Sequence, residues 1–208
     1  VVIGAGPGGF AAALRAAREG ASVVVIEKYD MPGGVHTSGL QGAANKGVGG
    51  IHSELMERFD REGAIYTVTE KELPGWAGNP LSHYEWYLPP GSPFRRSSFN
   101  PDAAGNIMSR MLEEAGVRTC YGADFVDVTL DRHGTESSIR EAIVETASGR
   151  QAIRGRIFID GSGTSEVVAR AGAPFVRGGG RQPETVRQDG CSRPIPGGLL
   201  WIMSGIDF

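Results

Sequence analysis

The sequence predicts an α/β fold built on a parallel sheet, and three features near its start support this class. An apolar run over residues 1–3 leads directly into the glycine-rich stretch Gly4-Ala5-Gly6-Pro7-Gly8-Gly9. An alanine-rich segment over residues 10–17 follows, and Gly20 is placed to end it as a helix. The next apolar run, residues 22–26, is continuous, as in a strand covered on both faces. The expected order is therefore strand, glycine turn, helix and strand.

Gly4, Gly6 and Gly9 have the spacing of a G-x-G-x-x-G turn. In such a turn the first glycine allows a sharp bend, the second a close pyrophosphate, and the third tight packing of the helix on the sheet. The N-terminus of the following helix also favours a phosphate. Glu27 ends the second strand at about the spacing (~20 residues) of an acid that binds ribose hydroxyls. We therefore expect a Rossmann-like dinucleotide site that disfavours NADP; the alternative is a glycine-rich turn in another α/β fold.

Length and composition indicate an ordinary soluble protein. The 208 residues suit one domain, or one domain and part of a second. The net charge of −3 gives no reason to expect nucleic acid or an anionic membrane as partner, and no apolar stretch approaches the ~20 residues of a membrane span. Cys120 and Cys191 form no C-x-x-C motif. We expect a cytoplasmic protein without a metal site.

The rest of the chain predicts further elements of the same fold. We expect a helix over residues 51–61, an irregular insertion over about 64–98, and a helix from Asn100 to about Ala115. A short strand is expected at 117–121, and then a β-meander of three segments, at 123–130, 139–146 and 151–154. A strand at 156–160 and a helix at 164–171 complete the list.

The domain organisation follows from this order. Residues 1–176 are expected to form one domain, and residues 177–208 to begin an incomplete substrate or cap domain. Strand-like residues stand at both ends of the sequence, so we expect a fragment of a longer protein.

This layout resembles the FAD-binding fold of the glutathione-reductase type, in particular the FAD-dependent oxidoreductase family. The resemblance rests on four segments, which span nearly the whole chain in the family's order: Val1 to Ala13, Val25 to Gly39, Phe99 to Val117, and Phe158 to Ala173. The second and fourth segments are more particular to flavin enzymes than the first.

The resemblance implies FAD as cofactor and gives roles to individual residues. The pyrophosphate would be held by the turn residues Gly4, Ala5, Gly6, Pro7, Gly8 and Gly9. Glu27 would bind the adenosine ribose, with Lys28 beside it. A loop including Gly34 and Thr37 would pass near the pyrophosphate and the isoalloxazine. Val126 would offer backbone hydrogen bonds to the adenine, and Gly161 and Gly163 would let the last strand pass close to the dinucleotide.

The implied function is that of an oxidoreductase. The flavin would take a hydride or two electrons from a small organic substrate and pass them to an unidentified electron acceptor. The family usually completes its flavin site with a C-terminal Gly-Asp segment, and nothing after Gly180 matches it. Two alternatives stay open: an NAD-dependent dehydrogenase domain, which the β-meander and the Gly33 loop oppose, and a non-enzymatic FAD-binding subunit.

Two histidines are candidates for chemistry. His36-Thr37, followed by Gln41-Gly42 and Asn45, resembles the H-T-x-x-x-Q-G-x-x-N stretch of succinate dehydrogenase and fumarate reductase flavoproteins, where the histidine is covalently joined to FAD. The alternatives are that His36 lines the flavin pocket noncovalently or only forms part of a loop. His83 is a candidate acid/base or substrate-binding group in an aromatic segment, or part of a surface loop packed by its own aromatic rings.

Overall fold

The computed structural model describes residues 1–42, 49–67, 97–134 and 136–175. His83 and the expected second domain, residues 177–208, lie outside these ranges.

A four-stranded parallel sheet forms the centre of the described structure. Its order is β5 (Arg118–Tyr121), β2 (Val24–Glu27), β1 (Val2–Ile3) and β9 (Ile159–Asp160). Ile3 is in register with Ile26 on one side and with Asp160 on the other. Because all four strands run in the same direction, the glycine turn, Glu27 and Asp160 emerge at one edge of the sheet. The α/β class and the parallel sheet are confirmed.

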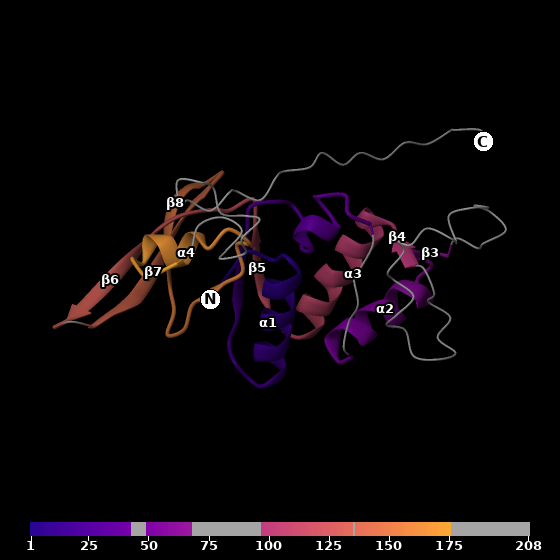
Figure 1. Cartoon of the computed structure of the whole chain (residues 1–208), viewed down its shortest axis with the longest axis horizontal. Coiled ribbons are helices and arrows are strands. Elements are labelled where there is room, and N and C mark those ends of the chain that lie inside the picture. Colours follow the sequence, from indigo (N-terminus) through magenta and orange to yellow (C-terminus); the bar gives the residue numbers. More distant parts are fainter. Residues whose placement is uncertain (43–48, 68–96, 135, 176–208) are drawn as a thin grey trace, which may run out of the picture.

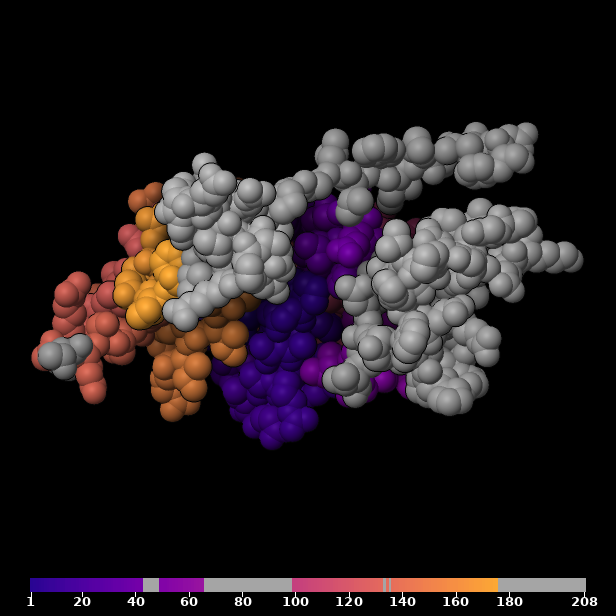
Figure 2. Space-filling model, viewed as in Figure 1, coloured from indigo at the N-terminus to yellow at the C-terminus, as the bar shows by residue number. Residues whose placement is uncertain are grey.

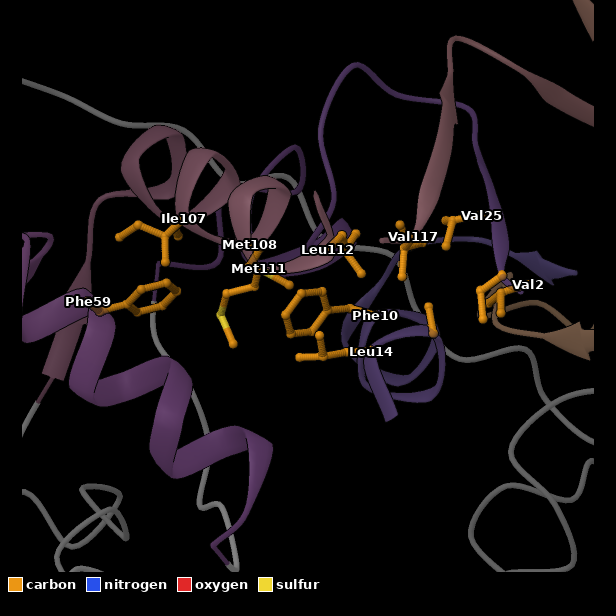
Figure 3. Packing of buried hydrophobic residues seen from close by; sticks show 14 of the residues in the cluster. Val2, Phe10, Leu14, Val25, Phe59, Ile107, Met108, Met111, Leu112 and Val117 are labelled. Atoms are coloured by element: carbon orange, nitrogen blue, oxygen red, sulfur yellow. The ribbon is translucent and has the colours of Figure 1, made fainter. Parts of the chain in front are cut away.

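Two helices, α1 (Pro7–Arg18) and α3 (Pro101–Glu114), lie on one face of this sheet, and a third, α2 (Ile51–Arg61), packs against α3 beyond them (Figure 1). The apolar side chains of α1, Phe10 and Leu14, pack against Met111 and Leu112 of α3, as Figure 3 shows. Val2 and Val25 extend the same cluster from the sheet. No helix within the described ranges is both long and apolar enough to span a bilayer.

The ends of these helices follow from local sequence chemistry. The N–H groups of Gly20 and Ala21 donate to the carbonyl oxygens of Ala17 and Ala16, at 2.9 and 3.0 Å, and Gly20 has a φ of +87°. This is a Schellman motif, in which glycine is favoured because it adopts a positive φ without strain. At the start of α3, the Asn100 side chain accepts the N–H groups of Asp102 and Ala103. The expected helix ends are confirmed there.

An antiparallel meander covers the other face of the sheet. It consists of β6 (Asp124–His133), β7 (Glu136–Thr146) and β8 (Gly149–Arg154), and it is followed by β9 and the short helix α4 (Glu166–Arg170). Ile3 and Ile26 point to this side and pack with Val144 and Val167. In Figure 1 the meander lies at the opposite end of the structure from α2. Both faces of the sheet are thus covered, as its apolar strands predict.

Figure 2 shows α1, in indigo, at the surface of the molecule. Ion pairs join the helices there: Arg18 to Glu54 at 2.7 Å, and Arg58 to Glu54 and Glu114 at 3.2 and 2.7 Å. Such exposed pairs each contribute about 0–1 kcal/mol. The apolar contacts between α1, α2 and α3 therefore dominate the stability of this layer.

The structure differs from the sequence-based expectations at several elements. The expected irregular insertion has regular ends, since β3 (Ile65–Thr67) pairs antiparallel with β4 (Ser97–Phe99). Phe99 is buried there with its ring 5.0 Å from that of Phe59. A 3₁₀ turn, η1 (Gly34–His36), lies within the expected loop. β9 covers only the last two residues of the expected strand.

Candidate functional site

A cavity of about 490 Å³ lies at the carboxyl edge of the parallel sheet. Its size is within the usual range for small-molecule and cofactor sites, about 300–1,000 Å³. Its lining comes from the end of β1 with the glycine turn, the end of β2, the η1 loop, the start of β6, the segment after β9, and Glu166 of α4. Most of the cofactor-binding residues expected from the sequence are therefore brought together: Gly4, Gly6, Pro7, Gly8, Glu27, Lys28, Gly34, Gly161 and Gly163.

Three glycines beside the cavity are required by packing within the protein. A Cβ atom on Gly9 would lie 1.9 Å from the Gly4 carbonyl oxygen. One on Gly4 would lie 2.4 Å from the Gly161 carbonyl oxygen, and one on Gly161 would lie 2.9 Å from the Gly9 Cα. The turn after β1, the start of α1 and the segment after β9 therefore meet backbone to backbone, and no side chain fits between them.

Gly6 has a different environment from these three glycines. A Cβ atom added to Gly6 would have no protein atom closer than the Gly161 carbonyl oxygen, at 4.0 Å. Gly6 lines the cavity, and its φ of −59° and ψ of 178° are accessible to any residue. Neither packing nor backbone conformation therefore requires glycine at this position. The open space beside Gly6 is what a closely approaching phosphate needs.

The N-terminus of α1 faces this open space with free hydrogen-bond donors. No side chain caps the helix, and its first turn contains no acidic residue. The Phe10 N–H donates to the Gly6 carbonyl oxygen, so the first intrahelical bond begins there. The N–H groups of Gly8 and Gly9 precede it and have no intrahelical acceptor, because helices leave their first donors unpaired. These groups and the helix dipole form a site for an anion.

Glu27 is buried at the edge of the cavity, with a side chain that is already hydrogen-bonded. It is 5% exposed, and its two carboxylate oxygens accept the N–H groups of Ala5 at 2.6 Å and Tyr29 at 3.0 Å. Lys28 is exposed on the cavity lining, with its Nζ 5.0 Å from the centroid of the Tyr29 ring. The carboxylate, the ammonium group and the aromatic ring thus come from three consecutive residues at the end of β2.

Asp160 is a residue of this site that sequence reasoning missed. One of its oxygens accepts the N–H and hydroxyl of Ser162, at 3.0 and 2.6 Å, and the other accepts the N–H groups of Val167 and Val168, both at 3.0 Å. Burial alone would raise the pKa of Asp160, but these hydrogen bonds outweigh it and hold the pKa below its ordinary value. Asp160 therefore fixes the segment that contains Gly161 and Gly163 against α4. The available sequence clue was an acid at the end of a strand, directly before Gly-Ser-Gly.

We expect Asp160→Asn to lower the free energy of unfolding by about 1–3 kcal/mol at neutral pH, since a carboxylate bound by four donors would be replaced by an amide. Because the folded state depresses the pKa of Asp160, the stabilisation by its charge is present above the ordinary aspartate pKa. It is lost as pH falls through the folded-state pKa. Urea unfolding of both proteins from neutral to acidic pH tests this, and the difference between them should shrink in acid. A constant difference across that range would contradict the charge-based explanation.

Five of the expected site residues within the described ranges do not line the cavity: Ala5, Gly9, His36, Thr37 and Val126. Thr37 is buried, and its hydroxyl donates to the Pro32 carbonyl oxygen at 2.8 Å. The His36 ring lies edge-on to Phe99, with centroids 5.9 Å apart, and its Nδ1 is 3.3 Å from the Gln41 carbonyl oxygen. The structure therefore packs His36 and Thr37 into the protein rather than bringing them to the cavity.

Val126 and Ala5 lie beside the cavity without belonging to its lining. The β6–β7 register passes from Phe125 to Asp127, so Val126 is the extra residue of a β-bulge. A bulge leaves its extra residue outside the ladder, and Phe125, which precedes it, lines the cavity. Ala5 is fully buried beneath the turn. The cavity and its glycine turn together form the candidate cofactor site.

The chain belongs to the FAD-dependent oxidoreductase family, whose model matches residues 1–197. Membership implies FAD as the cofactor and indicates an enzyme. Among curated protein sequences, none matches this chain.

Several solved structures share the fold of this chain. THI4 of Thermovibrio ammonificans is 16% identical, with a TM-score of 0.52 over 81% of this chain and 59% of its own. The flavin-dependent brominase Bmp2 is 21% identical, with a TM-score of 0.54 over 82% of this chain and 39% of its own. A geranylgeranyl bacteriochlorophyll reductase-like protein of Thermoplasma acidophilum is 19% identical, with a TM-score of 0.53 over 82% and 41%. The chain thus spans less than two thirds of the length of each of these proteins, and the likeness is one of fold.

Proposed function

We propose that this chain binds FAD noncovalently in the cavity and acts as the FAD-binding portion of an oxidoreductase. The observation on which the proposal depends is the open space at Gly6, directly in front of the uncapped N-terminus of α1. When bound, the flavin supplies hydride or two-electron transfer between an organic substrate and an electron acceptor. The remaining tasks belong to the protein: binding, orientation and exclusion of water.

The residues present fit two parts of the dinucleotide, the charged pyrophosphate and the polar ribose. The N–H groups of Gly8 and Gly9 are available for the pyrophosphate, and Gly6 leaves room for it. Glu27 is available for the ribose hydroxyls, because each carboxylate oxygen can accept a second hydrogen bond beside the one it has. Lys28 adds a positive charge at the same end of the cavity. The proposed adenine contact is the backbone of Val126 at the bulge of β6.

The contacts of Gly34 suggest how the η1 loop takes part. A Cβ on Gly34 would lie 2.9 Å from the Gly6 Cα, so the loop passes directly over the glycine turn. Val35, the next residue, is 54% exposed and lines the cavity. We assign this loop to the pyrophosphate and the flavin side of the site, with Val35 as an apolar contact.

The visible absorption spectrum of the purified chain, recorded before and after acid precipitation, tests the proposal. We expect a flavin spectrum, with all of the colour released into the supernatant, because His36 does not line the cavity. Colour in the precipitate would instead demonstrate covalent attachment and restore His36 as its site. A colourless protein that also takes up no added FAD would contradict the proposed function.

A further inference from the structure

We propose that Glu27 positions the phosphate-binding turn through the Ala5 N–H, in addition to any contact with a ribose. The inference rests on the proposed dinucleotide site and deepens it. It gives the last residue of β2 a role in binding the phosphates as well as the ribose.

The position of Glu27 follows from the sheet. Ile26 is in register with Ile3, so Glu27 stands beside Gly4, where the chain leaves β1. The Gly4 N–H donates to the Ile26 carbonyl oxygen at 2.7 Å, and the ladder of backbone bonds then ends. The N–H of the next residue, Ala5, donates to the Glu27 side chain instead of a backbone carbonyl, at 2.6 Å. The carboxylate therefore continues the β1–β2 pairing into the turn.

Both backbone polar groups of Ala5 form hydrogen bonds. Its N–H donates to Glu27, and its carbonyl oxygen accepts the Gly33 N–H at 2.7 Å. Ala5 is fully buried, so water does not replace the carboxylate without a rearrangement. An N–H bond to a buried carboxylate is charge-assisted, and it is stronger than a bond between neutral groups.

Loss of the carboxylate would therefore change the turn itself. The Ala5 N–H would be buried without an acceptor, which costs about 1–3 kcal/mol unless the backbone moves. Ala5 directly precedes Gly6, whose backbone forms the wall of the cavity. Movement of Ala5 would shift Gly6 relative to the N–H groups of Gly8 and Gly9. Phosphate binding would then weaken even for a ligand that has no ribose hydroxyls.

A comparison of two ligands distinguishes positioning of the turn by Glu27 from ribose binding by Glu27. ADP has both ribose hydroxyls and a diphosphate, whereas 2′,3′-dideoxy-ADP keeps the diphosphate and lacks both hydroxyls. We would measure the Kd of each by titration calorimetry for the wild-type chain, Glu27→Ala, Glu27→Gln and the control Glu113→Ala. Glu113 is an exposed glutamate on α3, outside the cavity lining. Hydrogen exchange at the Ala5 amide gives a second readout that does not depend on a ligand.

The expected result is that Glu27→Ala weakens 2′,3′-dideoxy-ADP by about tenfold or more, the loss that corresponds to one charge-assisted hydrogen bond. Glu27→Gln should weaken it less, because the amide oxygen can still accept the Ala5 N–H. Glu113→Ala should bind both ligands like the wild type. Exchange at the Ala5 amide should accelerate in Glu27→Ala, while the amides within α3 keep their protection.

Two outcomes would count against the inference or its basis, and the experiment also allows for a Glu27→Ala variant that does not fold. If Glu27→Ala weakens ADP but leaves dideoxy-ADP unchanged, Glu27 acts on the ribose alone and the inference is wrong. If Glu27→Ala does not fold, the same comparison in Glu27→Gln and the exchange rate of its Ala5 amide decide the question. If the wild-type chain binds neither ligand, the proposed dinucleotide site fails, and the exchange rate at Ala5 alone decides whether Glu27 holds the turn.

Discussion

Gly6→Val is expected to abolish FAD binding while leaving the chain folded. The valine side chain would occupy the open space in front of the α1 N-terminus, where we place the pyrophosphate. We expect the affinity to fall by roughly a hundredfold or more, which corresponds to about 2.8 kcal/mol. The measurement is the Kd for FAD from flavin fluorescence, together with urea unfolding followed by circular dichroism.

The fold should tolerate this substitution because glycine is not needed at the position for internal reasons. The φ and ψ of Gly6 are in the extended region that residues before proline adopt. Apart from the chain neighbours of Gly6, the atom nearest to an added Cβ would be the Gly161 carbonyl oxygen, at 4.0 Å. Valine is a poorer N-cap than glycine, so a loss of up to about 1 kcal/mol in stability is expected. Ala21→Val, an exposed site beyond the end of α1, is the matched control. Unchanged FAD binding in a folded Gly6→Val variant would show that the glycine turn does not bind the cofactor.

The elements that the sequence predicted well are those whose cause is local. The Asn100 cap, the Gly20 helix end and the spacing of Gly4, Gly6 and Gly9 each depend on a few neighbouring residues. A capping side chain or a glycine with positive φ acts within one or two turns of the chain. Composition and order along the chain were therefore sufficient to predict the parallel sheet and the helices beside it.

The parts that the sequence did not predict depend on contacts between distant segments. β3 and β4 are separated by residues 68–96 in the sequence and pair with Ile65 opposite Phe99. No local pattern in either strand predicts that pairing. The hydrogen bonds of Asp160 to Val167 and Val168 depend on how α4 returns to the end of β9. Both require knowledge of the assembled fold.

The sequence also did not predict which side chains of the loop after β2 face the cavity. The loop that contains His36 and Thr37 does reach the cavity, but Gly34 and Val35 line it instead. The 3₁₀ turn η1 directs the Thr37 hydroxyl to the Pro32 carbonyl oxygen and leaves the His36 ring against Phe99. A motif fixes the path of a loop more reliably than it fixes which of its side chains face the ligand.

Gly9→Ala is expected to have the opposite effect from Gly6→Val, because it should destabilise the fold rather than block the cavity. The added Cβ would lie 1.9 Å from the Gly4 carbonyl oxygen, a backbone atom that cannot rotate away. Overpacking a close contact typically costs 1–3 kcal/mol, and we expect about 3 kcal/mol or more here because α1 would have to move off β1. That is a large fraction of the 5–15 kcal/mol that stabilises a typical domain.

Gly8→Ala is the matched control, since it adds the same methyl group to the adjacent residue of α1. A Cβ on Gly8 would meet nothing within 4 Å, and alanine is favoured over glycine within a helix by up to about 1 kcal/mol. Urea unfolding should therefore give a much lower midpoint for Gly9→Ala and an equal or higher midpoint for Gly8→Ala. Equal midpoints for the two variants would mean that α1 does not contact the β1 turn as closely as described. If instead Gly9→Ala unfolds early while Gly6→Val keeps its fold and loses FAD, the glycines of one turn divide into those that hold the helix to the sheet and one that makes room for the cofactor.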